Sequence, residues 1–100
     1  MRVKTFHVGD VLSVYFGITL PPNGMQGVYR LTDHLLETNL THDETVEKLG
    51  DCASLLSTQF PWLMTLEDPD LLTADQREPW GAAIEREHGI WISVLSQSSM

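Results

Sequence analysis

The 100-residue sequence predicts a small α+β domain in which three to four helices pack on a two-stranded ribbon formed by the N- and C-terminal strands. Apolar and polar residues alternate near both ends of the chain, over residues 3–8 and 89–96, as they do in strands. Between these segments, apolar residues recur at helical spacing behind capping residues. Because a lone two-stranded ribbon is marginally stable in water, we expect it to pack against the helices or to continue across a dimer interface.

The length and composition fit one domain with one modest core, because a chain of this size buries about two-thirds of its unfolded surface. We assign residues 1–96 to a single small acidic globular domain and expect residues 97–100 to form a loose tail. No apolar run approaches the roughly 20 residues that span a membrane. No signal-peptide core precedes Gly9 either, so we expect a cytoplasmic protein.

The first helix is expected directly after the strand over residues 3–8, which Gly9 and Asp10 interrupt. Asp10 is the predicted N-cap of a short helix over residues 11–17, and Gly17 is its predicted end. The β-branched and aromatic residues within this segment leave a strand as the alternative.

Residues 17–36, GITLPPNGMQGVYRLTDHLL, raise the question of whether this stretch grips a ligand or starts a helix. A phosphate-binding loop would read GxxxxGK[ST] or GxGxxG after a strand, and this stretch fits neither pattern. The sequence therefore predicts a turn over residues 21–24, followed by a helix from Met25 to about Thr38.

The third helix, over residues 41–60, has the clearest start signal, because Thr41 followed by Glu44 forms a capping box. Pro61 ends this helix. Its predicted buried stripe is Val46, Leu49, Ala53, Leu56 and Phe60. Residues 61–79 are a connector too apolar to be disordered. Thr73 and Gln76 resemble a second capping box, but Pro79 argues against an uninterrupted helix from there, so we expect a short first turn and then a last helix with Pro79 at its first position and Gly89 at its end.

The charge is unevenly placed along a chain whose formal net charge is −8. Residues 1–36 have a balance of +1 and residues 37–100 a balance of −9. An acidic field disfavours direct binding of nucleic acid or membranes and attracts basic partners. The predicted partner-binding residues are therefore carboxylates: Asp43, Glu44, Glu47, Asp51, Glu67, Asp68 and Asp70. Solubility is the competing explanation for the same charge.

Two tryptophans, Trp62 and Trp91, are candidate interface anchors, since tryptophan is enriched at the energetic centres of interfaces. Burial in the core, or cover over it, is the alternative for both residues and for Trp80.

Three sets of residues are of the types that occur in catalytic sites or bind metals. His34, Glu37 and His42 could share a metal, but a zinc site needs three or four converging ligands, and surface positions near a helix end explain these residues better. Ser13, His7 and Asp10 lack the surroundings of a catalytic nucleophile. Cys52 has acidic neighbours that disfavour a thiolate and is predicted to face the core. We therefore predict no catalytic residue, no metal and no cofactor.

The segments KTFHVGDVLSV, NGMQGVYRL, LTH and FPWL resemble a family of small uncharacterised proteins from bacterial and phage genomes. The family pattern runs K-T-F-x-x-G-D-V-L-S-V and later G-M-x-G-V-Y-x-L. The resemblance covers about residues 4–63, implies a phage or prophage setting, and supplies no chemistry. The acidic segment THDETVEKLGDC departs from the pattern, which makes it the candidate for a specialised partner.

The function we predict is a non-enzymatic protein-binding module of phage type. It would block the basic surface of a host protein in the host cytoplasm, as an anti-CRISPR protein does, through the acidic face of the helix over residues 41–60. The first alternative is a structural or assembly accessory that dimerises through a strand edge. The second alternative is a small metal-dependent enzyme that uses His34, Glu37 and His42.

Overall fold

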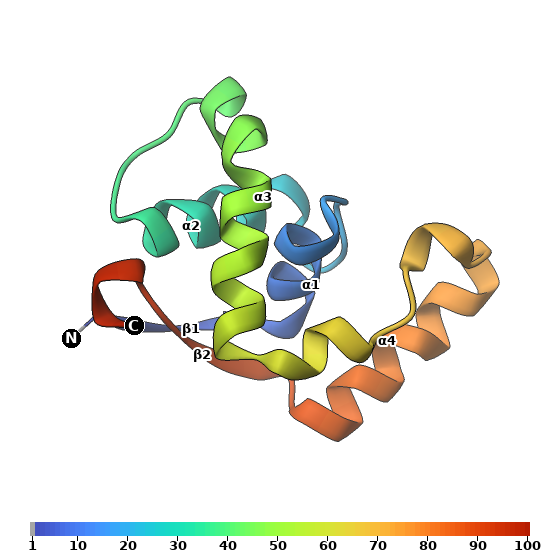
Figure 1. The fold of residues 1–100 in the computed structure, drawn as a ribbon. Coiled ribbons are helices and arrows are strands. Elements are labelled where there is room, and N and C mark those ends of the chain that lie inside the picture. The colour runs from blue at the N-terminus through green and yellow to red at the C-terminus, as the bar shows by residue number, and fades with distance from the viewer. Residues whose placement is uncertain (1) are drawn as a thin grey trace.

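The computed structural model describes residues 2–100 and has the predicted α+β fold (Figure 1). The strands and α-helices are β1 (Val3–His7), α1 (Val8–Phe16), α2 (Gly24–Leu36), α3 (His42–Gln59), α4 (Ala74–His88) and β2 (Trp91–Leu95). Short 3-10 turns are η1 (Pro61–Thr65), η2 (Pro69–Leu71) and η3 (Gln97–Ser99).

The two terminal strands pair with each other in antiparallel register, with Phe6 opposite Ile92. Phe6, Ile92 and Val94 are buried, because one face of the ribbon lies against the helices. Figure 1 shows α1, α2 and α3 above the ribbon and α4 at one side. The helices therefore supply the apolar cover that a two-stranded ribbon needs.

The core lies between this ribbon face and the first three helices. Leu31 and Leu35 of α2 and Leu56 of α3 are completely buried there, together with Leu63 of η1. Within residues 2–100, none of the helices is both long and apolar enough to cross a bilayer.

The first helix begins earlier than predicted, because the chain passes from β1 into α1 without a break at Gly9. His7 is the N-cap residue, and its Nδ1 accepts a hydrogen bond from the backbone N–H of Gly9 at 2.9 Å. Asp10 is therefore not the cap, and its buried carboxylate is bound by Asn23 instead. Gly17 ends the helix in the left-handed conformation (φ 70°), as predicted.

The glycine- and proline-rich segment after α1 packs against that helix and leads through a turn into α2. The backbone N–H of Leu20 donates to the Ser13 hydroxyl at 3.0 Å, and that hydroxyl donates to the Gly9 carbonyl at 2.7 Å. A Cβ on Gly9 would overlap the carbonyl of Pro21, so glycine is needed here for close approach.

Helix α3 has the predicted capping box, but its buried stripe is rotated relative to the prediction. Val46 is 52% exposed, whereas Thr45 and Cys52 are buried beside Leu56. Periodicity alone placed Val46 inside because it is the more apolar of two adjacent residues. In the structure Thr45 is the residue that α3 turns into the protein at this level, whereas Val46 lies at the edge of a surface hollow that Met25 and Leu49 also line.

The last helix also differs from the prediction, since α4 runs without interruption through Pro79. A second capping box, formed by Thr73 and Gln76, fixes the start of α4 at Ala74. Pro79 is exposed and lies early in the helix. The carbonyl of exposed Asp75, which lacks its usual partner four residues later, can be solvated.

The end of the chain is packed rather than loose. Residues 97–99 form η3, and the backbone N–H of Ser98 donates to a carboxylate oxygen of Glu37 at 3.2 Å. The backbone N–H of Arg2 donates to the Ser99 hydroxyl at 2.7 Å. These polar contacts tie the segment after β2 to α2 and to the beginning of β1.

Candidate functional site

The α3 helix carries four carboxylates on one side, towards its N-terminal end. We call Asp43, Glu44, Glu47 and Asp51 the α3 acidic face. All four residues are exposed. The helix forms here because Thr41 caps it and because carboxylates in the first turn interact favourably with the positive end of the helix dipole.

The four carboxylates of this face have different partners within the protein. Glu44 closes the capping box by accepting a hydrogen bond from the Thr41 backbone at 3.0 Å, and that bond lowers the pKa of its carboxyl group. Asp51 lies 3.9 Å from the Lys48 ammonium. Asp43 and Glu47 have no ion-pair or hydrogen-bond partner among residues 2–100. Their charges are therefore free to act on a partner.

The connector contributes a second group of carboxylates, Glu67, Asp68 and Asp70, all of them exposed. Asp68 is the N-cap of η2, and its Oδ1 accepts a hydrogen bond from the Asp70 backbone at 2.9 Å. Asp70 is partly neutralised, because the Arg77 guanidinium lies 3.5 Å from its carboxylate. Arg77 also donates to the Pro69 carbonyl at 2.9 Å, which holds this turn against α4.

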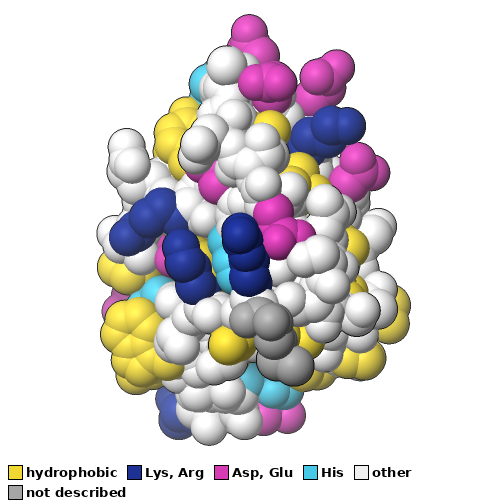
Figure 2. Space-filling model, turned by 90° about the vertical axis from the view of Figure 1, so that its left-hand side faces the viewer, with side chains coloured by type: hydrophobic (Ala, Val, Ile, Leu, Met, Phe, Trp, Pro, Cys, Tyr) yellow, Lys and Arg dark blue, Asp and Glu magenta, His cyan; other side chains and the backbone are white. Residues whose placement is uncertain are grey.

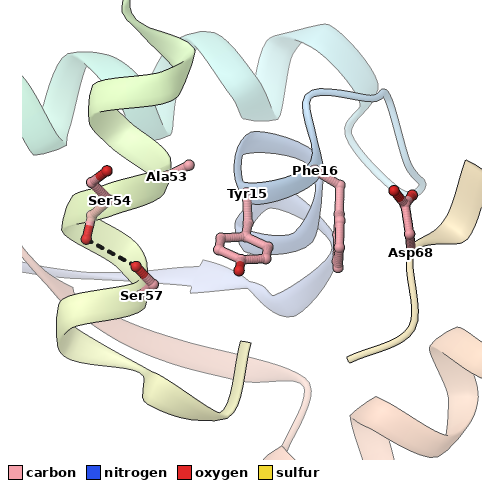
Figure 3. A pocket seen from close by; sticks show the side chains of 6 residues that line it. All are labelled: Tyr15, Phe16, Ala53, Ser54, Ser57 and Asp68. Atoms are coloured by element: carbon pink, nitrogen blue, oxygen red, sulfur yellow. Dashed lines mark hydrogen bonds between the residues drawn. The ribbon is translucent and has the colours of Figure 1, made fainter. Parts of the chain in front are cut away.

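A shallow hollow of about 470 Å³ lies between α3 and the connector (Figure 3). It is lined by Tyr15, Phe16, Ala53, Ser54, Ser57 and Asp68. Figure 3 shows the two aromatic rings between the serines of α3 on one side and the Asp68 carboxylate on the other. The rings meet edge to face, with centroids 4.8 Å apart and an interplanar angle of 83°.

The hollow continues the α3 acidic face. Glu47 and Ser54 are seven residues apart, so they lie on the same side of α3 and about 10 Å apart along its axis. The structure thus places Asp68 in the same hollow as Ser54 and Ser57 of α3. It places Asp70 with Arg77 instead.

Several basic side chains gather in the middle of the view in Figure 2. Arg2, Lys4 and Arg30 line one hollow there, next to Glu37, and the Arg2 guanidinium lies 3.5 Å from the Glu37 carboxylate. Figure 2 shows the acidic side chains above them, where the N-terminal end of α3 lies. The charge asymmetry between the two parts of the sequence is thus also a separation in space.

The two candidate anchors, Trp62 and Trp91, have different environments. Trp62 is half-buried and stacks on His88, with ring centroids 3.8 Å apart and an interplanar angle of 10°. It therefore fastens η1 to the end of α4. Trp91 is 66% exposed on the outer face of the ribbon and meets His7 edge to face.

The structure does not bring His34, Glu37 and His42 together as a metal site. The buried His34 donates from Nε2 to the Val94 carbonyl at 2.7 Å, because a carbonyl can only accept. Glu37 binds Arg2 and Ser98, and His42 pairs with the Tyr29 hydroxyl. Within residues 2–100 there is no group of three His, Cys, Asp or Glu residues that could hold a metal ion.

The other two sets of chemistry-bearing residues serve the fold. His7, Asp10 and Ser13 each have a different partner in the corner between β1 and α1, so they form no relay. Cys52 is completely buried. Burial, assisted by the neighbouring Asp51 carboxylate, raises the pKa of the Cys52 thiol to about 11, so the thiolate that nucleophilic chemistry needs is scarce.

Sequence reasoning missed the residues that join Asp68 in the hollow, namely Tyr15, Phe16, Ser54 and Ser57. The sequence did contain one indication of this surface. Two aromatic residues directly precede Gly17, which ends a helix too short to bury both of their side chains. The role of the connector could not be inferred, since it depends on how η2 folds back towards α1.

Comparison with protein-family models, with curated proteins and with solved structures finds no match to this chain.

Proposed function

We propose that this protein is a non-enzymatic binding module that blocks a basic surface of another protein through the α3 acidic face. The observation that carries the proposal is that Asp43 and Glu47 are exposed and have no cationic partner among residues 2–100. They lie on a helix end that projects from the body (Figure 1). Carboxylates that the fold has not neutralised retain their full attraction for a partner's lysines and arginines.

The proposed mechanism is competition for a surface that normally binds a polyanion. A helix that carries several carboxylates on one face presents negative charges about every turn, and a positively charged channel for nucleic acid can accept them in place of phosphates. Long-range attraction would make the association fast and sensitive to salt. Resemblance to phage and prophage proteins supports a host protein as the target and the host cytoplasm as the place, in the manner of an anti-CRISPR inhibitor.

The experiment is affinity capture by the tagged protein from a bacterial lysate, at about 0.05 M and about 0.5 M salt. We expect the wild-type protein to capture a basic protein at low salt and to release it at high salt. The α3 variant reverses three charges, Asp43→Lys, Glu47→Lys and Asp51→Lys. It spares Glu44, whose side chain the capping box needs. We expect this variant to capture no such protein.

The matched control reverses three exposed charges of α4, Asp75→Lys, Glu78→Lys and Glu87→Lys, none of which belongs to the α3 acidic face. Both variants change the net charge by the same amount. Equal capture by the two variants would mean that the charge serves solubility alone. Circular dichroism of both variants checks that the helices remain.

One observation favours the alternative function, an accessory that dimerises through the ribbon. Trp91 is exposed, and exposed Val3 lies on the same face of the ribbon, where side chains alternate along each strand. Ile92, by contrast, is buried, so its substitution would test folding rather than association. If a dimer forms here, Trp91→Ser lowers the mass measured by light scattering, and Leu71→Ser, at another exposed apolar residue, leaves it unchanged.

A further inference from the structure

We infer that the hollow lined by Tyr15, Phe16, Ala53, Ser54, Ser57 and Asp68 binds one arginine side chain of the protein partner. The inference rests on the proposed function, which requires a basic partner, and it specifies where one of that partner's cations is recognised. Three features carry it: the aromatic wall, the carboxylate at one end, and the hydroxyl groups at the other (Figure 3).

The aromatic wall offers a guanidinium group a surface on which to stack. Tyr15 and Phe16 are only half-buried, so each ring leaves part of its surface in the hollow. A cation is attracted by the negative face of an aromatic ring, and arginine stacks on such faces more often than lysine does. The edge-to-face contact between the two rings fixes their orientation before any ligand binds.

The carboxylate end of the hollow has unused hydrogen-bonding capacity. Only Oδ1 of Asp68 has a partner among the described residues, the backbone N–H of Asp70. That bond holds the side chain in place, while Oδ2 remains free to accept from a guanidinium. No Lys or Arg residue lines the hollow, so the chain itself does not fill the site.

The α3 side of the hollow supplies hydroxyl groups. Ser57 donates to the Ser54 carbonyl at 3.1 Å, and the Ser54 hydroxyl has no partner among residues 2–100 (Figure 3). A guanidinium has five N–H donors in one plane, so it can stack on an aromatic ring while it donates to an acceptor at the edge of that ring. A lysine ammonium is a compact point charge and cannot stack in this way. The site therefore favours arginine.

Nuclear magnetic resonance of the ¹⁵N-labelled protein tests this inference, with the blocked peptide acetyl-Gly-Arg-Gly-amide as the probe and its lysine counterpart as the comparison. We expect saturable, millimolar binding that shifts the amide signals of residues 15–16, 53–57 and 68. The arginine peptide should bind about threefold or more tightly than the lysine peptide. Equal binding of the two peptides, or shifts outside these residues only, would overturn the inference.

Two variants with one matched control sharpen the test. Asp68→Asn removes the charge but keeps an oxygen for the bond from Asp70, and we expect binding about fivefold or more weaker. Ser54→Lys places a cation in the hollow, at an exposed helical position, and should abolish binding. Asp70→Asn removes the same charge two residues away, beside Arg77, and should change the affinity by less than about twofold. Equal effects of Asp68→Asn and Asp70→Asn would contradict a specific site.

The two proposals fail in different ways. If the peptide does not bind the hollow, but the α3 variant fails to capture the protein that the wild type captures, the arginine site is wrong and the proposed function stands. If the peptide binds as expected but the α3 variant still captures the protein, the α3 acidic face is not the binding surface. The arginine site would then be supported independently.

Discussion

Asp10 accepts two hydrogen bonds from the side-chain amide of Asn23, at 3.0 and 3.2 Å, although it is only 2% exposed. These bonds attach the loop before α2 to the middle of α1. Gly27 of α2 lies against the same carboxylate, so closely that a side chain there would overlap it. Asp10, Ser13 and Gly27 thus have structural roles in the packing of α1 against α2 and the loop between them.

The first prediction concerns two glycines in helices. Gly27→Ala should lower the free energy of unfolding by about 2 kcal/mol, because the new methyl group collides with the buried Asp10 carboxylate. Gly50→Ala should raise it by about 0.5–1 kcal/mol, because Gly50 lies in α3 with open space around it and alanine has the higher helix propensity. Urea denaturation measures both, and a loss of stability in both variants would contradict the packing described.

The second prediction concerns the link between α3 and the ribbon. The Gln59 amide donates to the Leu95 carbonyl and accepts from the Leu95 N–H, both at 2.8 Å, as a neighbouring strand would. Gln59→Glu replaces the donor NH₂ group by an oxygen that faces the Leu95 carbonyl. This change should lower the free energy of unfolding by about 1–2 kcal/mol at pH 7. The loss should shrink as the pH falls towards about 4, because the protonated carboxyl group can donate again.

The control for Gln59 is the same substitution at Gln97, whose amide lies 3.4 Å from the Leu36 carbonyl on the surface. Gln97→Glu should change the free energy of unfolding by less than about 0.5 kcal/mol. Similar losses for the two variants at pH 7 would show that added charge, rather than the paired hydrogen bonds with Leu95, determines the effect.

The third prediction concerns the only cysteine. Burial raises the pKa of the Cys52 thiol from 9.0 to about 11, so the folded state holds its proton more tightly than the unfolded state does. The resulting stabilisation is complete below about pH 9 and is lost as the pH rises through about 11. At pH 8, a thiol reagent should therefore react only after denaturant is added. Rapid labelling of the native protein would mean that Cys52 is accessible.

The strands and helices could be predicted where the local signals were strong. The capping box of Thr41 and Glu44 set the start of α3, because both of its bonds involve residues three positions apart. The face that α3 buries could not be predicted in full, since the burial of Thr45 in place of Val46 depends on how α3 is rotated about its axis when it packs on the other helices. A local rule for proline failed at Pro79, where the upstream capping box fixes the helix.

The candidate site was only partly predictable from the sequence. The charge pattern identified the carboxylates, because exposure follows from charge for most Asp and Glu residues. It could not tell that Asp68 lies beside Tyr15 and Phe16 while Asp70 lies beside Arg77. That distinction depends on the turn of η2, which brings residues about fifty positions apart into one hollow.

The association rate of the purified captured protein, measured against ionic strength, tests the central claim most directly. The wild-type protein and the α4 control variant should associate rapidly at low salt and slow down steeply as salt is added. The variant with Asp43, Glu47 and Asp51 reversed should associate slowly at every salt concentration. An association rate for this variant that matches the wild type, with the same dependence on salt, would contradict the claim that the α3 acidic face meets the cations of its partner.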